Sequence, residues 1–129
     1  MQIKGIVRPS APSGVILAHG GSRTGYCVYL DEGRLCFATC VNKKRTVVRS
    51  SVAITGPASF EANWNSKGDV FLKVDGKLVG KAKVGSIQHE PGDSIQIGAD
   101  LIQPVGDYNT PNHFSGIIEN LTFKYPNGT

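Results

Sequence analysis

The chain has 129 residues, and 14 Lys and Arg against 10 Asp and Glu give it a formal net charge of +4. It is 40% hydrophobic, and it is long enough to form one domain, residues 1–129, whose core needs no disulfide or metal. No stretch approaches the ~20 apolar residues of a membrane span, and residues 1–12 lack the apolar core of a signal peptide. We therefore expect no membrane partner, and a chain that is either cytoplasmic or a domain cut from a longer exported protein.

The N-terminal residues alternate between apolar and polar with the period of a β-strand. This pattern predicts a strand over residues 3–7, and a Pro- and Ser-rich turn follows at residues 9–14. Residues 15–19 predict a short apolar strand, which the pair Gly20-Gly21 ends. His19 closes this strand, and we expect it to be a hydrogen-bonded structural histidine.

Residues 26–41 predict a hairpin with a two-residue turn at Glu32-Gly33. In that register one face of the hairpin carries four large apolar side chains, whereas a longer turn would mix them with Cys36 and Arg34. Burial of one face therefore selects the two-residue turn. The four side chains are those of Val28, Leu30, Leu35 and Phe37.

The same register places Cys27, Cys36 and Cys40 on the other face of the hairpin, with Cys27 opposite Ala38. Diagonal neighbours across two strands lie roughly 7–8 Å apart, which exceeds normal disulfide reach. Cys36 and Cys40 lie on one strand, about 13 Å apart. We expect three free thiols that act as small, half-buried apolar groups.

The rest of the chain predicts further short strands. They cover residues 46–54 and 59–65, a second hairpin over 69–84 with its turn at Asp75-Gly76, and residues 94–97 and 114–123. Residues 98–113 are irregular, and a slip of the apolar phase predicts a bulge near Glu119-Asn120. No helical period occurs, so an antiparallel two-sheet sandwich is expected. Its predicted core adds Leu72, Val74 and Phe123 to the four side chains of the first hairpin.

Several motifs follow one another in an order that resembles a known family. They are GVILAHGG at 14–21, GYxxYLxxGxLxF at 25–37, VxLxVDGK at 70–77, IGxD at 97–100 and FxGII at 114–118. This set is similar to the laminin G-like, concanavalin A-like jelly-roll family over residues 3–124. With the Val-Gly-Asp-Tyr run at 105–108, it more narrowly resembles the sandwich domain at the C-terminus of some bacterial arylsulfatases. The resemblance implies an all-β antiparallel jelly-roll sandwich in a mostly exported family, but no sulfatase activity, because the chain contains no sulfatase catalytic domain.

Catalytic patterns are missing from the sequence. Glycosidases need paired carboxylates that flank one bond, and the acidic residues here are scattered without an E-x-D-x-E run. Nothing marks a nucleophile elbow either. We expect a non-catalytic binding module rather than an enzyme.

Sugar binding needs an aromatic ring with polar neighbours. Tyr108 lies in the irregular segment, where we expect it to be exposed at a rim of the sandwich, and Asn63 and Asn65 flank Trp64. Trp64 could equally pack under a loop. The candidate ligand-binding residues are Tyr108, His113, Trp64, Asn109 and Tyr29.

Asp100 and Asp107 stand at two ends of a loop that also offers backbone carbonyls. Hard oxygen donors of this kind suit Ca²⁺, and the family resemblance also implies a calcium ion at a rim loop. The alternative is that both carboxylates accept hydrogen bonds from their own loop. Calcium is therefore a candidate cofactor, and no other is expected.

The run Lys43-Lys44-Arg45, with Arg49 nearby, is either a patch for anionic polymers or a solvated hairpin end. No aromatic residue interleaves with these charges, as a single-stranded nucleic-acid groove requires, so no nucleic-acid partner is expected. The sequence favours a module that binds carbohydrate or another anionic polymer, with or without calcium. The alternative is a structural domain that packs against a protein partner, such as an enzyme or a second copy.

Overall fold

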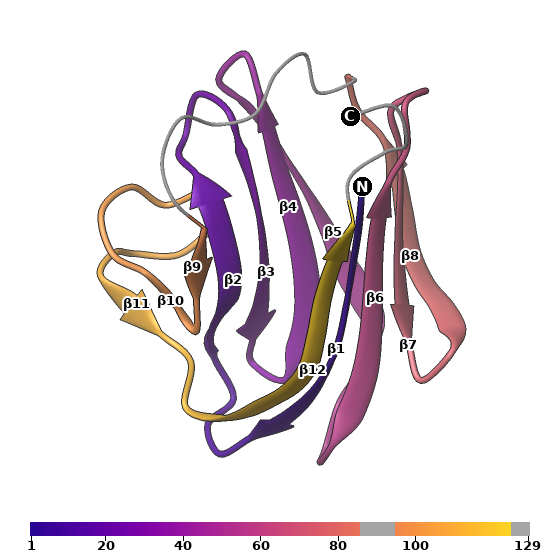
Figure 1. Cartoon of the computed structure of the whole chain (residues 1–129), viewed down its shortest axis with the longest axis vertical. Coiled ribbons are helices and arrows are strands. Elements are labelled where there is room, and N and C mark those ends of the chain that lie inside the picture. The colour runs from indigo at the N-terminus through magenta and orange to yellow at the C-terminus, as the bar shows by residue number, and fades with distance from the viewer. Residues whose placement is uncertain (86–94, 125–129) are drawn as a thin grey trace.

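The structure, a computed structural model, describes residues 1–85 and 95–124. They form a sandwich of two five-stranded sheets with a small two-stranded sheet beside it (Figure 1). The strands are β1 (Gln2–Pro9), β2 (Gly14–Gly20), β3 (Gly25–Asp31), β4 (Arg34–Val41), β5 (Lys44–Ala53), β6 (Ala58–Trp64), β7 (Asp69–Val74), β8 (Lys77–Lys83), β9 (Gln96–Ile97), β10 (Ala99–Asp100), β11 (Asn112–His113) and β12 (Gly116–Lys124). The predicted all-β antiparallel jelly-roll sandwich is confirmed. The described residues contain no helix that could span a membrane.

The first sheet has the strand order β12-β1-β6-β7-β8, and the second has the order β5-β4-β3-β2-β9. β10 and β11 pair with each other beside the second sheet. The edge strands β8 and β5 approach each other closely: a Cβ atom added to Gly80 would lie only 2.6 Å from Cγ1 of Val48. Gly80 therefore lets the two sheets meet along this side. The predicted strand at 94–97 is β9, and Ser94 lies outside the described residues.

The main core lies between the two sheets. The predicted core side chains of the two hairpins are all buried, from Val28 at 0% exposure to Val74 at 5%. Phe123 is only partly buried at the edge of this cluster, where it stacks on Tyr26 with ring centroids 5.9 Å apart. The prediction of the core is thus confirmed, with Phe123 at its margin.

Both predicted hairpin turns are confirmed. Leu30 pairs with Leu35, and the central residues Glu32 and Gly33 have φ values of 49° and 83°. Two positive φ values match the type I′ turn, whose twist suits a tight hairpin. The turn at Asp75-Gly76 shows the same pattern, with φ values of 50° and 80°.

The predicted irregularity in the last strand is a β-bulge. The pairing of β1 with β12 shifts between Lys4 and Ile6, and Asn120 has a φ of 53°. A bulge of this kind lets the apolar face of β12 change phase while the strand stays paired. As a result, both Ile118 and Leu121 pack against the core.

From the sequence we expected the irregular segment 98–113 to lie at a rim of the sandwich, but it does not. Its Val105 and Tyr108 pack on the outer face of the second sheet, against small apolar residues of β2, β3 and β4. This second cluster includes Cys27, Cys36 and Cys40, which are unpaired, as predicted, but fully buried rather than half-buried. The second sheet is therefore buried on both faces.

Candidate functional site

The segment 98–113 is fixed to the second sheet by polar bonds as well as by packing. Arg45 on β5 donates from Nε to the carbonyl of Val105 at 2.8 Å and from a terminal nitrogen to that of Pro104 at 3.1 Å. The thiol of Cys40 also lies 3.3 Å from the Val105 carbonyl. Val105 itself is fully buried. These contacts hold the middle of the segment against the sheet.

Tyr108 serves this attachment and is not the exposed platform that we expected. Its hydroxyl donates to Oδ2 of Asp100 at 2.5 Å, and its ring meets that of Tyr29 edge-on at 5.0 Å between centroids. Burial is the main cause that raises the pKa of Tyr108. The ring is half-buried because it closes over the small side chains of the second cluster.

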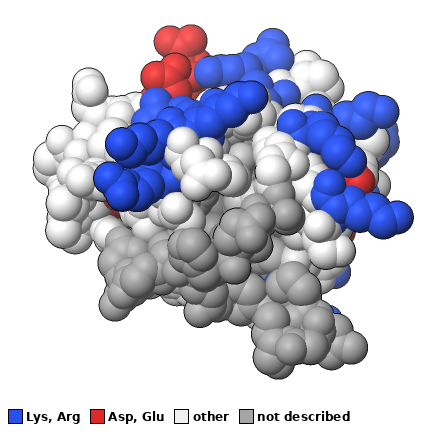
Figure 2. Space-filling view, turned by 90° about the horizontal axis from the view of Figure 1, so that it is seen from above, with Lys and Arg blue, Asp and Glu red and all other residues white. Residues whose placement is uncertain are grey.

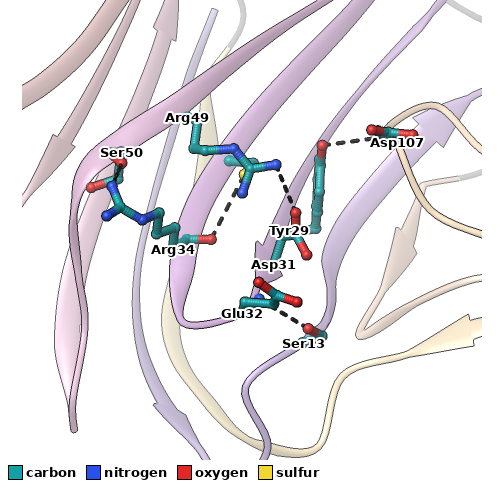
Figure 3. Close-up of polar contacts among 9 residues, drawn as sticks. Ser13, Tyr29, Asp31, Glu32, Arg34, Arg49, Ser50 and Asp107 are labelled. Carbon is teal, nitrogen blue, oxygen red and sulfur yellow. Dashed lines mark hydrogen bonds and ion pairs between the residues drawn. The ribbon is translucent and has the colours of Figure 1, made fainter.

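Tyr29 and Trp64 are not accessible to a ligand, which corrects their place among the candidate residues. Each is only 2% exposed. The hydroxyl of Tyr29 accepts a hydrogen bond from the backbone N–H of Asp107 at 3.3 Å, and Figure 3 shows the ring pointing toward Asp107. The indole N–H of Trp64 donates to the carbonyl of Gly85 at 3.2 Å, within the main core. The alternative that Trp64 is a packing residue therefore agrees with the structure.

His113 and Asn109 are exposed on the same segment, as is Asp107. His113 pairs with Ala99 in the small sheet, and the carbonyl of Asn109 accepts a bond from Asn112 at 3.3 Å. The structure thus keeps a polar loop surface, on which His113 is the exposed ring from the predicted set. His19 is 6% exposed, and its Nδ1 lies 2.7 Å from the hydroxyl of Tyr26, as a structural histidine would.

The fit of a calcium ion depends on Asp100. Its Oδ2 accepts bonds from Tyr108 and from the backbone N–H of Val105 at 3.3 Å, whereas its Oδ1 is buried and has no hydrogen-bond partner among the described residues. An unsatisfied carboxylate oxygen is a suitable Ca²⁺ ligand. The carboxylate of Asp107 points to solvent by its exposure. Residues 1–85 and 95–124 contain no cluster of three or more His, Cys, Asp or Glu that could hold a metal.

The three thiols are chemically quiet. Burial raises the pKa of Cys27 and Cys40 and raises that of Cys36 to about 11. Figure 3 shows Arg49 beside Asp31 on this face, where the two side chains form an ion pair at 2.6 Å. A thiol with a raised pKa is a poor nucleophile at neutral pH.

One end of the sandwich carries a group of cations that sequence reasoning found only in part. Four segments meet there: the β2–β3, β4–β5 and β6–β7 turns and the end of β8. Figure 2 views this end from above and shows Lys and Arg side chains gathered over it. We call it the basic rim, and its residues are Arg23, Lys43, Lys44, Arg45, Lys67 and Lys83, all of them exposed.

Backbone contacts assemble the basic rim from both sheets. The N–H of Lys43 donates to the carbonyl of Arg23 at 2.9 Å, which joins two turns of the second sheet. Gly85, just after β8, lies so close to Val41 that an added Cβ atom would be 3.3 Å from its Cγ1. Lys67 and Lys83 of the first sheet are thereby brought to the end that bears Lys43. The sequence could not show this, because the turns are far apart along the chain.

The rim is weakly compensated by acidic residues. Its four segments contain a single carboxylate, Asp69, which pairs with Lys83 at 3.2 Å. Hydrogen bonds from Lys83 and then Asn65 lower the pKa of Asp69. Within the described part of the chain, Lys43 and Lys44 form no ion pair. The rim therefore presents a positive potential to solvent.

Comparisons with known proteins bear on the fold. No protein-family model matches the sequence, and a search of curated proteins found no match. Among solved structures, domains LG4-5 of the mouse laminin alpha1 chain match with a TM-score of 0.74 at 19% identity over 93% of this chain. The chain has the laminin G-like jelly-roll fold.

The LG1-3 region of the laminin alpha2 chain matches as well, with a TM-score of 0.70 and 12% identity over 93% of this chain. This chain spans 33% of the first of these structures and 26% of the second. Both likenesses lie at low sequence identity, so they establish the fold alone. Neither of these two structures supports the narrower resemblance of the motifs to arylsulfatase-associated domains.

Proposed function

We propose that this laminin G-like domain is a non-catalytic module that binds an extended anionic polymer, such as an acidic glycan, at the basic rim. The observation that carries the proposal is the meeting of four cationic segments from two sheets at one end, with one carboxylate among them. Separate charges on a rigid scaffold suit a ligand that is long and repeatedly charged, because several weak contacts then add. The fold likeness to laminin domains is consistent with such a module.

The engagement of the acidic residues supports the absence of catalysis. Most carboxylates of the described residues already bind a structural partner, which leaves no pair poised to act as acid and nucleophile. The pairs are Asp31 with Arg49, Glu61 with Asn63, Asp69 with Lys83, Asp75 with Ser59, Asp100 with Tyr108, and Glu119 with Arg8.

Calcium is proposed as a structural ion for segment 98–113. Oδ1 of Asp100 would be its buried ligand, and the carboxylate of Asp107 with nearby carbonyls would complete the site. The ion would supply the positively charged partner that Oδ1 of Asp100 lacks among the described residues. In this proposal it fixes the segment and takes no part in a reaction.

A protein-interaction role is the second candidate, and one observation favours it. Three large apolar side chains between β9 and the loop after β10 are exposed: Ile97 at 62%, Leu101 at 47% and Ile102 at 80%. Exposed apolar groups close together in the chain are typical of a surface that a protein covers. This surface lies on the small sheet's side of the molecule and does not include the rim.

The test is binding of dextran sulfate to immobilised protein, with uncharged dextran as the neutral polymer. We expect dextran sulfate alone to bind, and Lys44→Glu or Arg23→Glu to weaken it. Lys77→Glu is the matched control, since Lys77 is an exposed lysine after the Asp75-Gly76 turn, at the other end of β7. Equal weakening by all three variants, or no binding to either polymer, would move the protein-interaction role into first place.

A further inference from the structure

We propose that a hollow on the outer face of the first sheet is a second binding site, for a short acidic saccharide. The hollow measures about 500 Å³ and is lined by residues of β12, β1, β6 and β7. This volume lies in the usual range for small-ligand sites, roughly 300–1,000 Å³. The proposal does not require the basic rim to bind anything.

The hollow lies on the face of the sandwich that segment 98–113 does not cover. That segment packs on the second sheet, whereas the side chains of Lys4, Thr122 and Lys124 on the first sheet are exposed. Lys4 is 53% exposed and Glu61 is 23% exposed. The polar groups at the hollow are thus open to a ligand and held on paired strands.

Strand register sets the order of these groups. Lys4 on β1 pairs with Thr122 on one side and with Glu61 on the other, and Glu61 in turn pairs with Lys73. Residues that pair directly across antiparallel strands point to the same face, about 4.8 Å apart. One row of four polar side chains therefore crosses the sheet over about 14 Å.

Hydrogen bonds fix the single carboxylate at the centre of this row. Glu61 accepts from Nδ2 of Asn63 at 2.8 Å and from Nε2 of Gln2 at 3.4 Å, and Nζ of Lys4 lies 3.8 Å from it. Within the described residues, Lys73 and Lys124 form no ion pair. The hollow therefore contains an oriented acceptor surrounded by a net positive charge.

The β-bulge shapes the hollow. It inserts Asn120 opposite the Lys4–Ile6 step of β1, and Asn120, Gly5 and Ile6 all line the hollow. A bulge bends and twists its strand, which shapes the outer face of the sheet beside it. Ile6, which pairs with Ser59 on the outer face and is only partly buried, also borders it. The walls thus combine amide, hydroxyl, charged and apolar groups.

This combination matches an acidic sugar better than other anions. The hydroxyls of a sugar ring both donate and accept hydrogen bonds, and they find matching partners in Glu61, Asn120 and Thr122. The ammonium groups of Lys73 and Lys124 suit a carboxylate or sulfate on the ring. The apolar wall can contact the C–H face of a pyranose. A simple inorganic anion would use the lysines but not the fixed acceptor.

The experiment is calorimetric titration of the whole chain with trigalacturonate, a sulfated disaccharide and neutral maltotriose. We expect an acidic saccharide to bind, and Lys73→Ala to weaken its affinity by about tenfold, as loss of one charge-assisted contact would. Lys77→Ala serves as the control and should leave the affinity unchanged, because Lys77 follows the Asp75-Gly76 turn directly and does not line the hollow. Thermal melting of each variant shows that it is folded.

The rim variant Lys44→Glu separates this proposal from the proposed function. It should weaken dextran sulfate binding but leave the affinity for the short saccharide unchanged. Tighter binding of trigalacturonate or of the sulfated sugar identifies the acid group that the hollow takes. The proposal is overturned if maltotriose binds as well as the acids, if no saccharide binds at millimolar concentration, or if Lys44→Glu abolishes binding while Lys73→Ala does not.

Discussion

The hydroxyl of Tyr108 lies 2.5 Å from Oδ2 of Asp100, a carboxylate that is only 1% exposed. The two residues stand at different points of the same irregular segment, and their bond closes that segment over the second sheet. An ionised side chain is costly to bury unless it is hydrogen-bonded. Tyr108 is therefore part of what lets Asp100 stay buried, and the tyrosine ring acts as an anchor for the loop.

Replacing Tyr108 with Phe should destabilise the domain. The change keeps the ring but removes the donor to Asp100, which leaves a buried carboxylate short of a partner and costs about 1–3 kcal/mol. Urea denaturation measures this loss. Asn109→Ala is the matched control on the same segment, since Asn109 is exposed and should change stability by less than about 0.5 kcal/mol. Equal stability of the two variants would show that the bond contributes nothing.

The thiols should be protected in the folded chain. Burial keeps Cys27, Cys36 and Cys40 protonated, so an alkylating reagent at pH 8 should label none of them until the chain is unfolded. Mass spectrometry of native and denatured samples gives the count. Labelling of the native protein, or the loss of two hydrogens that marks a disulfide, would contradict the structure.

The same burial makes stability fall at alkaline pH. The pKa of Cys36 is about 11 in the folded state against an ordinary value of 9.0. Between these values the thiol is ionised in the unfolded chain but still protonated in the folded chain, which favours unfolding. The contribution of Cys36 to the free energy of unfolding is therefore complete below pH 9.0 and is lost as pH rises through about 11. Denaturation midpoints measured across this range should decline. Cys36→Ala should make the decline shallower, and an unchanged slope would speak against it.

The β3–β4 hairpin could be predicted from local information. A two-residue turn at Glu32-Gly33 and one apolar face allow a single register, and Leu30 opposite Leu35 confirms it. The same register correctly placed the cysteines together. Local pattern was sufficient here because turn geometry and burial both depend on residues near in sequence.

The outer cover of the second sheet could not be placed in the same way. Which face the segment 98–113 packs on depends on contacts between residues far apart in sequence, such as Arg45 with Val105. One signal was available: β2, β3 and β4 are apolar on both faces, which is typical of strands that are covered twice. This signal predicts that Tyr29 is buried and that Tyr108 is packed against the sheet.

Calcium should raise the thermal stability of the domain if the Asp100 site exists. Binding to the folded state alone adds roughly 2.7 kcal/mol at a hundredfold excess over the dissociation constant, which is a rise of several degrees in Tm. Asp107→Asn should remove the rise without altering Tm in chelator, because Asp107 is exposed and can be replaced at little structural cost. The same Tm in millimolar calcium and in chelator would rule out all but very weak binding.

Binding of an anionic polymer at the basic rim should depend steeply on salt. Contacts from Arg23, Lys43 and Lys44 are exposed, so mobile ions screen them, and each contact formed releases counterions from the polymer. We expect the affinity for dextran sulfate to fall by about tenfold between about 50 mM and 200 mM salt.

Lys44→Glu should reduce both the affinity at low salt and the slope of its logarithm against the logarithm of salt concentration, because one fewer ion-releasing contact forms. Lys77→Glu carries the same change of charge after the distant β7–β8 turn, so it should leave the slope unaltered. The comparison separates a local site from attraction by net charge, since both variants lower the net charge equally. Identical slopes for the two variants would mean that the polymer responds to the whole molecule's charge, and the rim would then have no specific role.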